Sequence, residues 1–203
     1  MSRRQLAIRR PFALPAQSAT MAIQLHPTES SMQIDLRYGR GSMPLTLPDD
    51  VDVTVVRKPP MPLLEDEAAS VERALDEPVG VQPLAELARG ANTACIAICD
   101  ITRPVPNHLF LRPMIERLLS AGIPQDGITV LVATGLHRPN EGEELAELIG
   151  DPWVLENARV ENHFARDNEA HVDLGRTETR GTVVRIDRRF VEADLRIATG
   201  LVE

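Results

Sequence analysis

Aromatic residues are scarce in this sequence of 203 residues, where tryptophan, tyrosine and phenylalanine together make up 3%. Proteins that bind single-stranded nucleic acid stack its bases on such rings, and few rings are present here. Positive charge is also in short supply, because 22 lysines and arginines against 30 aspartates and glutamates leave a net charge of −8. Both shortages argue against nucleic acid as a partner.

Long hydrophobic runs and cysteine pairs are lacking too. Nothing approaches the roughly 20 consecutive apolar residues of a membrane span, so we expect no membrane partner. The only cysteines are Cys95 and Cys99, which fall in one predicted strand and would lie about 13 Å apart on the same face, too far for a disulfide. We predict buried thiols in a reducing, cytoplasmic setting.

The amino-terminal part of the chain differs in composition from the rest. Residues 1–31 carry four arginines before the first acidic residue, Glu29. Arginines and prolines interrupt the apolar stretch that an export signal would need. We therefore expect a disordered or over-long tail over residues 1–31 and one domain over residues 32–203.

The domain begins with a short β-rich segment and continues as an α/β alternation. Alternating apolar residues predict strands at 33–38, 43–47 and 51–56. Two unbroken apolar runs, at 94–99 and 128–133, are typical of buried parallel strands, and each is followed by a predicted helix. The helices and strands that the sequence predicts besides these are 67–75, 83–89, 107–121, 160–164, 181–186, 187–193 and 195–199.

This order predicts an α/β fold, a Rossmann-like domain with a largely parallel central sheet flanked by helices, preceded by a short β-rich segment. A short helix is also expected after residue 140. Asn140 and Glu143 are spaced as a capping box at its start, and Gly150 is placed to end it.

Polar residues directly follow the two unbroken strands. Asp100, Thr102 and Arg103 come after the first, and His137 lies in the loop after the second. Ligands of open α/β sheets bind beyond the carboxyl ends of the strands. If the two strands are parallel neighbours, Arg103 and His137 emerge at one edge, where they offer a two-pronged cation and a base that titrates near neutral pH.

Each of these residues also has an ordinary structural explanation. Arg103 could form a salt bridge with Asp100, Asp100 and Thr102 could cap the turn, and His137 could be a solvated loop residue. His163 and His171 are eight residues apart, but no cysteine or further histidine accompanies them, so we predict no metal site. An ordinary nucleotide-binding domain is a weaker alternative, because the chain lacks both the Gly-x-Gly-x-x-Gly and the Walker lysine motif.

Four stretches resemble the nickel-pincer lactate racemase family. Residues 100–106 (Asp-Ile-Thr-Arg-Pro-Val-Pro) and 133–139 (Ala-Thr-Gly-Leu-His-Arg-Pro) match its Asp-x-Thr-Arg-Pro turn and its Thr-Gly-x-His-Arg loop, and residues 74–80 and 192–203 agree as well. The resemblance covers about residues 32–203. It implies the amino-terminal part of an isomerase that racemises or epimerises a 2-hydroxy acid such as lactate.

The resemblance also implies a cofactor and roles for particular residues. Family members use a nickel-bound pyridinium bis-thiocarboxylate mononucleotide that takes hydride from the substrate carbon while a histidine takes the hydroxyl proton. On the matching positions, Asp100, Ile101, Thr102 and Arg103 would bind this cofactor. Arg103 would also face the substrate, and His137 would be one of two acid/base histidines.

The chain departs from the family pattern in two ways. It ends at Glu203, before the segments that in the family carry the second histidine, the tethering lysine and a nickel ligand. We therefore expect a missing carboxy-terminal domain or partner chain, and neither cofactor nor activity in the chain alone. The alternative is a noncatalytic or split-enzyme binding module that contributes Arg103 and His137 to a site completed by another chain. Asp187 also stands where relatives often have asparagine.

Overall fold

The structure is a computed structural model that describes residues 31–201, and the chain divides into two compact units, Met1–Met61 and Pro62–Glu203. The predicted tail lies outside the described residues except for Ser31, where the first strand begins. The boundary between a tail over residues 1–31 and a domain over residues 32–203 stays a prediction.

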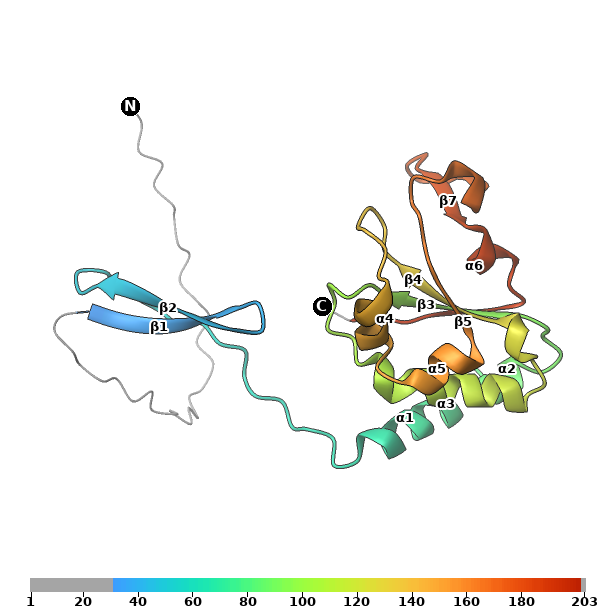
Figure 1. Cartoon of the computed structure of the whole chain (residues 1–203), viewed down its shortest axis with the longest axis horizontal. Coiled ribbons are helices and arrows are strands. Elements are labelled where there is room, and N and C mark those ends of the chain that lie inside the picture. Colours follow the sequence, from blue (N-terminus) through green and yellow to red (C-terminus); the bar gives the residue numbers. More distant parts are fainter. Residues whose placement is uncertain (1–30, 202–203) are drawn as a thin grey trace. The chain divides into compact units, whose positions relative to one another are not determined.

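The first unit contains an antiparallel hairpin of β1 (Ser31–Tyr38) and β2 (Gly41–Pro48), paired from Ser31↔Pro48 to Tyr38↔Gly41 (Figure 1). Gly39 takes a positive φ of 56° in the connecting turn, which glycine adopts without steric cost. The prediction of a third strand at residues 51–56 is wrong. A strand needs a backbone partner, and β1 and β2 pair only with each other among the described residues.

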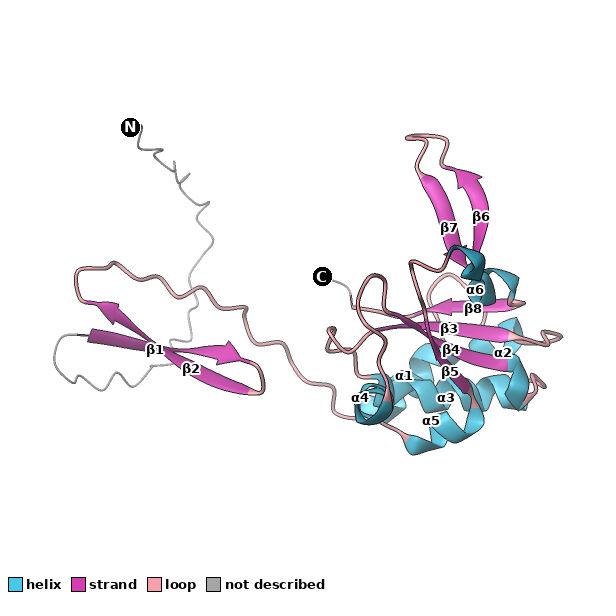
Figure 2. Cartoon of the chain, turned by 45° about the horizontal axis from the view of Figure 1, so that its top comes forward, coloured by secondary structure: helices cyan, strands magenta, loops and turns pink. Residues whose placement is uncertain are grey.

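The second unit is built on a four-stranded parallel sheet in the order β5-β4-β3-β8, as Figure 2 shows. Its strands are β3 (Ala94–Cys99), β4 (Ile128–Ala133), β5 (Arg159–Asn162) and β8 (Leu195–Ala198). The helices α1 to α5 pack on one face of this sheet (Figure 2). They are α1 (Glu67–Asp76), α2 (Leu84–Leu87), α3 (Asn107–Ser120), α4 (Gly142–Ile149) and α5 (Pro152–Asn157).

Fewer elements pack on the opposite face of the sheet. These elements are α6 (Arg188–Glu192) and the antiparallel pair of β6 (His171–Arg176) and β7 (Val183–Asp187). Two short 3₁₀ turns, at Gln125–Gly127 and Asn168–Ala170, complete the unit. The α/β architecture, the parallel sheet and the preceding β-rich segment are therefore confirmed, whereas α5 and β6 were not predicted.

The core lies mainly between the sheet and α3. Alternate residues of β3 and β4 point to this side, and among them Ile96 and Val130 have no exposed surface. The apolar stripe of α3 meets them with Leu111, Ile115 and Leu118, all fully buried at the spacing of one helix face. On the other face a small cluster forms where Phe190 and Ala193 cover Cys95 and Leu131.

Both cysteines are free thiols, but their surroundings differ. Cys95 is fully buried, as predicted, and burial raises its pKa to about 12. Cys99 lies near the end of β3 and is only partly buried. None of the helices in the part of the chain that the structure describes has the length and apolar character needed to cross a membrane.

Candidate active site

The turn after β3 is organised by the carboxylate of Asp100, which is 5% exposed. One of its oxygens, Oδ1, accepts hydrogen bonds from the Thr102 hydroxyl at 2.6 Å and from the Thr102 backbone N–H at 3.3 Å. The Arg103 N–H donates to the Asp100 carbonyl at 3.1 Å and closes the turn. The capping role that the sequence allowed for Asp100 is therefore present, and it occupies only one of the two carboxylate oxygens.

The second oxygen of Asp100 binds His137 from the loop after β4. The His137 Nδ1 lies 2.5 Å from Asp100 Oδ2. This contact is possible because β3 and β4 are parallel neighbours with Cys99 opposite Ala133, so both loops leave the same edge of the sheet. The loop itself is a turn in which the His137 N–H donates to the Thr134 carbonyl at 2.9 Å.

The charge on Asp100 decides which nitrogen of His137 carries the proton. Burial pushes the pKa of Asp100 up, but the hydrogen bonds from Thr102 and His137 outweigh it and hold this pKa below its ordinary value. An ionised carboxylate can only accept hydrogen bonds, so Nδ1 of His137 must donate. In neutral His137 the lone pair is then on Nε2, and the ring is largely exposed, with 57% of its side chain accessible. His137 is thus oriented as a base.

Arg103 lies at the other end of the same chain of contacts. Its Nη1 donates to the Thr102 hydroxyl at 3.2 Å, and its side chain is exposed. It forms no ion pair with Asp100, so the salt-bridge alternative is wrong. The guanidinium keeps donors for an anion, while Thr102, Asp100 and His137 follow it in a continuous line of hydrogen bonds. A base and a cation therefore lie at one edge of the sheet, as the strand order predicted.

Asn140 joins the two loops and was missed as a site residue. It is 2% exposed, and its Oδ1 accepts from the Ile101 N–H at 3.3 Å. Its own backbone exchanges two hydrogen bonds of 2.9 Å with the side chain of Asn162, the last residue of β5. The capping-box prediction is wrong, because α4 begins after Glu141 and no side chain caps it. The spacing from Asn140 to Glu143 looks identical in sequence whether the amide caps a helix or crosses to another loop.

Arg138 binds Glu144 and is therefore not oriented to bind a ligand. Its two terminal nitrogens donate to the two carboxylate oxygens of Glu144 at 2.8 and 2.5 Å. The same Glu144 accepts a short hydrogen bond from the Asn140 side chain. Arg138 and Glu144 therefore support the loop that carries His137.

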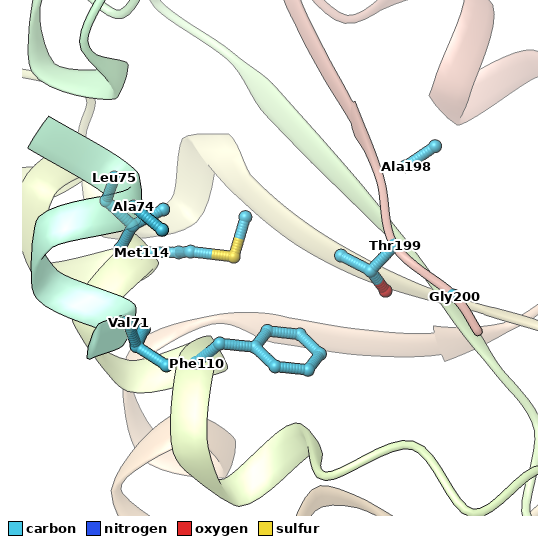
Figure 3. Close-up of a pocket in the computed structure, with 8 residues that line it drawn as sticks. All are labelled: Val71, Ala74, Leu75, Phe110, Met114, Ala198, Thr199 and Gly200. Atoms are coloured by element: carbon cyan, nitrogen blue, oxygen red, sulfur yellow. The ribbon is translucent and has the colours of Figure 1, made fainter. Parts of the chain in front are cut away.

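An apolar pocket of about 380 Å³ opens at the end of β8, on the helical side of the sheet (Figure 3). Phe110 and Met114 of α3 point into it, with Val71 and Leu75 of α1 beside them. Gly200, at its rim, approaches Cys99, the residue before Asp100. The pocket thus lies at the carboxyl edge of the sheet, where ligands of such folds bind.

The other histidines do not join this site. His108 is exposed at the start of α3. His163 and His171 form an edge-to-face ring contact of 4.9 Å and belong to the opposite side of the sheet. Within residues 31–201, no group of three or more histidine, cysteine, aspartate or glutamate side chains is arranged to hold a metal ion.

Known proteins with similar sequence or structure point to one family. The sequence profile of the lactate racemase N-terminal domain matches residues 38–203. The chain is 38% identical over 137 residues to a lactate racemase from Lactiplantibacillus plantarum, covering 68% of this chain and 32% of that protein. It is 30% identical over 172 residues to a lactate racemase from Thermoanaerobacterium thermosaccharolyticum, covering 84% of this chain and 40% of that protein.

Two solved structures share the fold. The lactate racemase apoprotein from Thermoanaerobacterium thermosaccharolyticum superposes with a TM-score of 0.66 at 28% identity, over 82% of this chain and 38% of that chain. A protein from Thermotoga maritima gives a TM-score of 0.50 at 19% identity, over 64% of this chain and 33% of that chain. This chain spans less than half the length of the curated relatives it matches. Because the profile match runs from residue 38 to residue 203, the chain belongs to the lactate racemase N-terminal domain family.

Proposed function

We propose that this chain is the amino-terminal part of a 2-hydroxy-acid racemase or epimerase of the lactate type. The observation that carries the proposal is the hydrogen bond from His137 to the ionised Asp100 at the carboxyl edge of the sheet. It leaves Nε2 of a largely exposed imidazole ready to accept the proton of a substrate hydroxyl. The family match supports the same reaction class.

Asp100 would act as a positioning residue in this reaction. Its contact to Nδ1 holds the imidazole in one tautomer, and its negative charge stabilises the imidazolium that forms when Nε2 takes a proton. The two bonds from Thr102 to the same carboxylate keep it in place. Arg103 would bind the substrate carboxylate or another anionic group through its planar pair of donors.

The cofactor that we propose is the nickel-pincer nucleotide, since no side chain can accept the hydride that oxidation of a 2-hydroxy acid releases. When bound, this group supplies the hydride acceptor. The exposed guanidinium of Arg103 fits its anionic phosphate, while the Thr102 hydroxyl accepts from Arg103 and holds it beside the turn. Asp100 and Ile101 would contribute by shaping the turn, the latter through its N–H bond to Asn140.

By resemblance to the family, the histidine that ligates the nickel belongs to a segment outside the matched residues 38–203. We therefore propose that a carboxy-terminal domain or a partner chain supplies the nickel ligand and completes the site. The split-enzyme alternative assigns the same role to this chain. In both cases the chain contributes His137 and Arg103 to a site that another part of the enzyme completes. We place the protein in the cytoplasm, where free thiols such as Cys95 and Cys99 persist.

The decisive experiment replaces His137 in the complete enzyme. The chain is co-expressed with the matching carboxy-terminal part of a curated relative or with its own continuation, and racemisation of D- and L-lactate is followed. The His137→Ala variant should lose about 10²–10⁴-fold in rate while its cofactor content stays that of the unchanged enzyme. The exposed His108 provides the control, since His108→Ala should leave both quantities unchanged. Wild-type rates in His137→Ala would remove the catalytic assignment.

A further inference from the structure

A second histidine–carboxylate pair lies on the opposite face of the sheet. His163 follows β5 directly, and its Nδ1 is 2.9 Å from Oδ2 of Asp187, the residue that ends β7. Asp187 is 4% exposed, and 19% of the His163 side chain is accessible. The pair shares no residue with the Asp100 turn or the His137 loop.

Asp187 is ionised and its position is fixed. Arg189 donates to its Oδ1 from Nε at 2.9 Å and to its Oδ2 from Nη2 at 2.6 Å. Burial raises the pKa of Asp187, but the bonds from Arg189 and His163 prevail and lower it to about 2. His163 must therefore donate from Nδ1, which leaves the lone pair of the neutral ring on Nε2.

A small pocket of about 210 Å³ adjoins this pair. Ala97, Leu131 and Ala133 of the central strands form an apolar floor, and Phe190 of α6 stands beside it. The volume lies below the range of about 300–1,000 Å³ that is usual for drug-sized ligands, so only a molecule of a few heavy atoms fits.

Arg185 lines the same pocket and retains donors for a ligand. Its Nε is 3.4 Å from Asp173 Oδ2, and its Nη1 donates to Asn168 Oδ1 at 3.1 Å. Both partners of this ion pair are about half exposed, so the pair adds little stability and can give way to another anion. Neither Nη2 of Arg185 nor Nε2 of His163 has a hydrogen-bond partner within residues 31–201.

We propose that this pocket binds a small hydroxycarboxylate, whose hydroxyl donates to Nε2 of His163 and whose carboxylate accepts from Arg185. The short alkyl part would lie over Ala97 and Ala133. An acceptor and a cation that line one small pocket with an apolar floor match these three parts of the molecule. The site is separate from His137, and its binding step needs neither cofactor nor turnover.

The test is a binding titration on the 203-residue chain alone, with the methyl groups of alanine labelled for NMR. L-Lactate should shift the signals of Ala97 and Ala133 in a saturable way. Propanoate, which has the same carbon chain without the hydroxyl, should bind about three- to tenfold more weakly, as expected for the loss of one hydrogen bond. Equal affinities, or the absence of saturable shifts with lactate, would contradict the proposal.

Two variants assign the contacts. His163→Phe keeps a ring over the pocket but removes Nε2, so lactate and propanoate should bind equally well. Arg185→Gln, at a half-exposed position, should weaken both acids at least about tenfold, because the hydrogen bonds lost involve charged groups. Arg180→Gln, in the exposed turn of the same hairpin, is the matched control and should bind as the unchanged chain does. A preference for lactate that survives His163→Phe, or equal binding by the two arginine variants, would overturn the assignment.

This titration separates the inference from the proposed function. If His137→Ala abolishes racemisation but the isolated chain gives no saturable shifts, only the pocket on the second face is refuted. If the shifts appear while His137→Ala is fully active, only the catalytic assignment is refuted.

Discussion

Asp100 binds groups from two directions, and this dual contact defines its role at the residue scale. Oδ1 accepts from Thr102 within its own turn, while Oδ2 meets His137 from a loop 37 positions along the chain. A carboxylate that only capped the turn would leave His137 free to rotate and to choose its tautomer. The contact with Asp100 therefore favours the interpretation of His137 as an oriented base over that of a solvated loop histidine.

Replacing Asp100 by asparagine tests whether it orients the base or contacts the cofactor. An amide can donate to Nδ1 and so favour the tautomer that carries its proton on Nε2, where the base is needed. We expect Asp100→Asn to lower kcat in the complete enzyme by about 10²-fold, with the cofactor content retained. Asp126→Asn, at an exposed position, serves as the control. A loss of cofactor that matches the loss of activity would instead assign Asp100 to cofactor binding.

Arg103 and Arg138 provide a matched pair for a second prediction. Both are exposed and lie at the same sheet edge, but Glu144 already binds two nitrogens of Arg138. Arg103→Lys should raise KM and lower kcat, together about tenfold or more in kcat/KM, because an ammonium cannot reproduce two parallel bonds to a carboxylate. Arg138→Lys should change kcat/KM much less. Steady-state racemisation kinetics measure kcat/KM of both variants. If Arg103→Lys changes kcat/KM as little as Arg138→Lys does, Arg103 acts only as a point charge.

At the scale of elements, the ends of helices and strands determine where the site residues lie. Loops leave β3 and β4 at the same edge because the strands are parallel, and α3 and α4 start from those loops. Gly150 ends α4 in the left-handed conformation with φ of 72°, as its position in the sequence predicted. Only the packing shows that this glycine also lies against α3.

Gly150→Ala should therefore be more damaging than a similar change elsewhere. A Cβ on Gly150 would lie 2.8 Å from Cβ of His108, at the start of α3, whereas a Cβ on Gly90 would meet nothing within 4 Å. Both glycines have nearly the same φ, 72° and 77°. We expect Gly90→Ala to cost about 1 kcal/mol through backbone strain alone and Gly150→Ala distinctly more.

Urea unfolding of the two variants, followed by circular dichroism, measures this difference. Equal losses of unfolding free energy would mean that α3 and α4 move apart at no cost. The site itself would then depend less on the contact between these two helices than the packing indicates.

At the scale of the whole α/β unit, charged contacts attach β6, β7 and α6 to the open face of the sheet. Arg189 links Asp187 to Glu161 of β5, and Asp187 also binds His163. Little apolar surface is buried here compared with the helical face. The attachment of this segment should consequently depend on the ionisation of Asp187.

The pH dependence follows from the lowered pKa of Asp187, about 2 in the folded chain. A carboxyl with an ordinary pKa near 4 when unfolded then stabilises the fold fully above that value, and the contribution disappears as the pH falls towards 2. The amount is about 2 kcal/mol for a shift of this size. Asp187→Asn should remove this part of the acid sensitivity.

Urea unfolding at several values between pH 5 and pH 2 compares the two chains. The unchanged chain should lose more unfolding free energy than Asp187→Asn over this interval. Asp126→Asn, at an exposed position in the other half of the unit, is the control and should follow the unchanged chain closely. Parallel curves for all three chains would show that Asp187 does not link folding to pH.

The sequence by itself determined most of the elements of the α/β unit and their order, although it missed α5 and β6. Unbroken apolar runs marked β3 and β4, the stripe of Leu111, Ile115 and Leu118 marked the buried face of α3, and glycines marked helix ends. These features are local, because periodicity and backbone conformation depend on residues close together in the chain. The same local rules placed Arg103 and His137 at one edge once the strands were taken as parallel neighbours.

Tertiary structure alone decided the partners of these residues. Alternation predicted a strand at residues 51–56, but a strand exists only where another backbone pairs with it. The contacts of Asp100 with His137, Asn140 with Asn162, and His163 with Asp187 join strand ends and loops that are distant in sequence. No local pattern encodes such pairs, because they form only when the sheet brings the ends of β3, β4 and β5 together and β7 packs beside them.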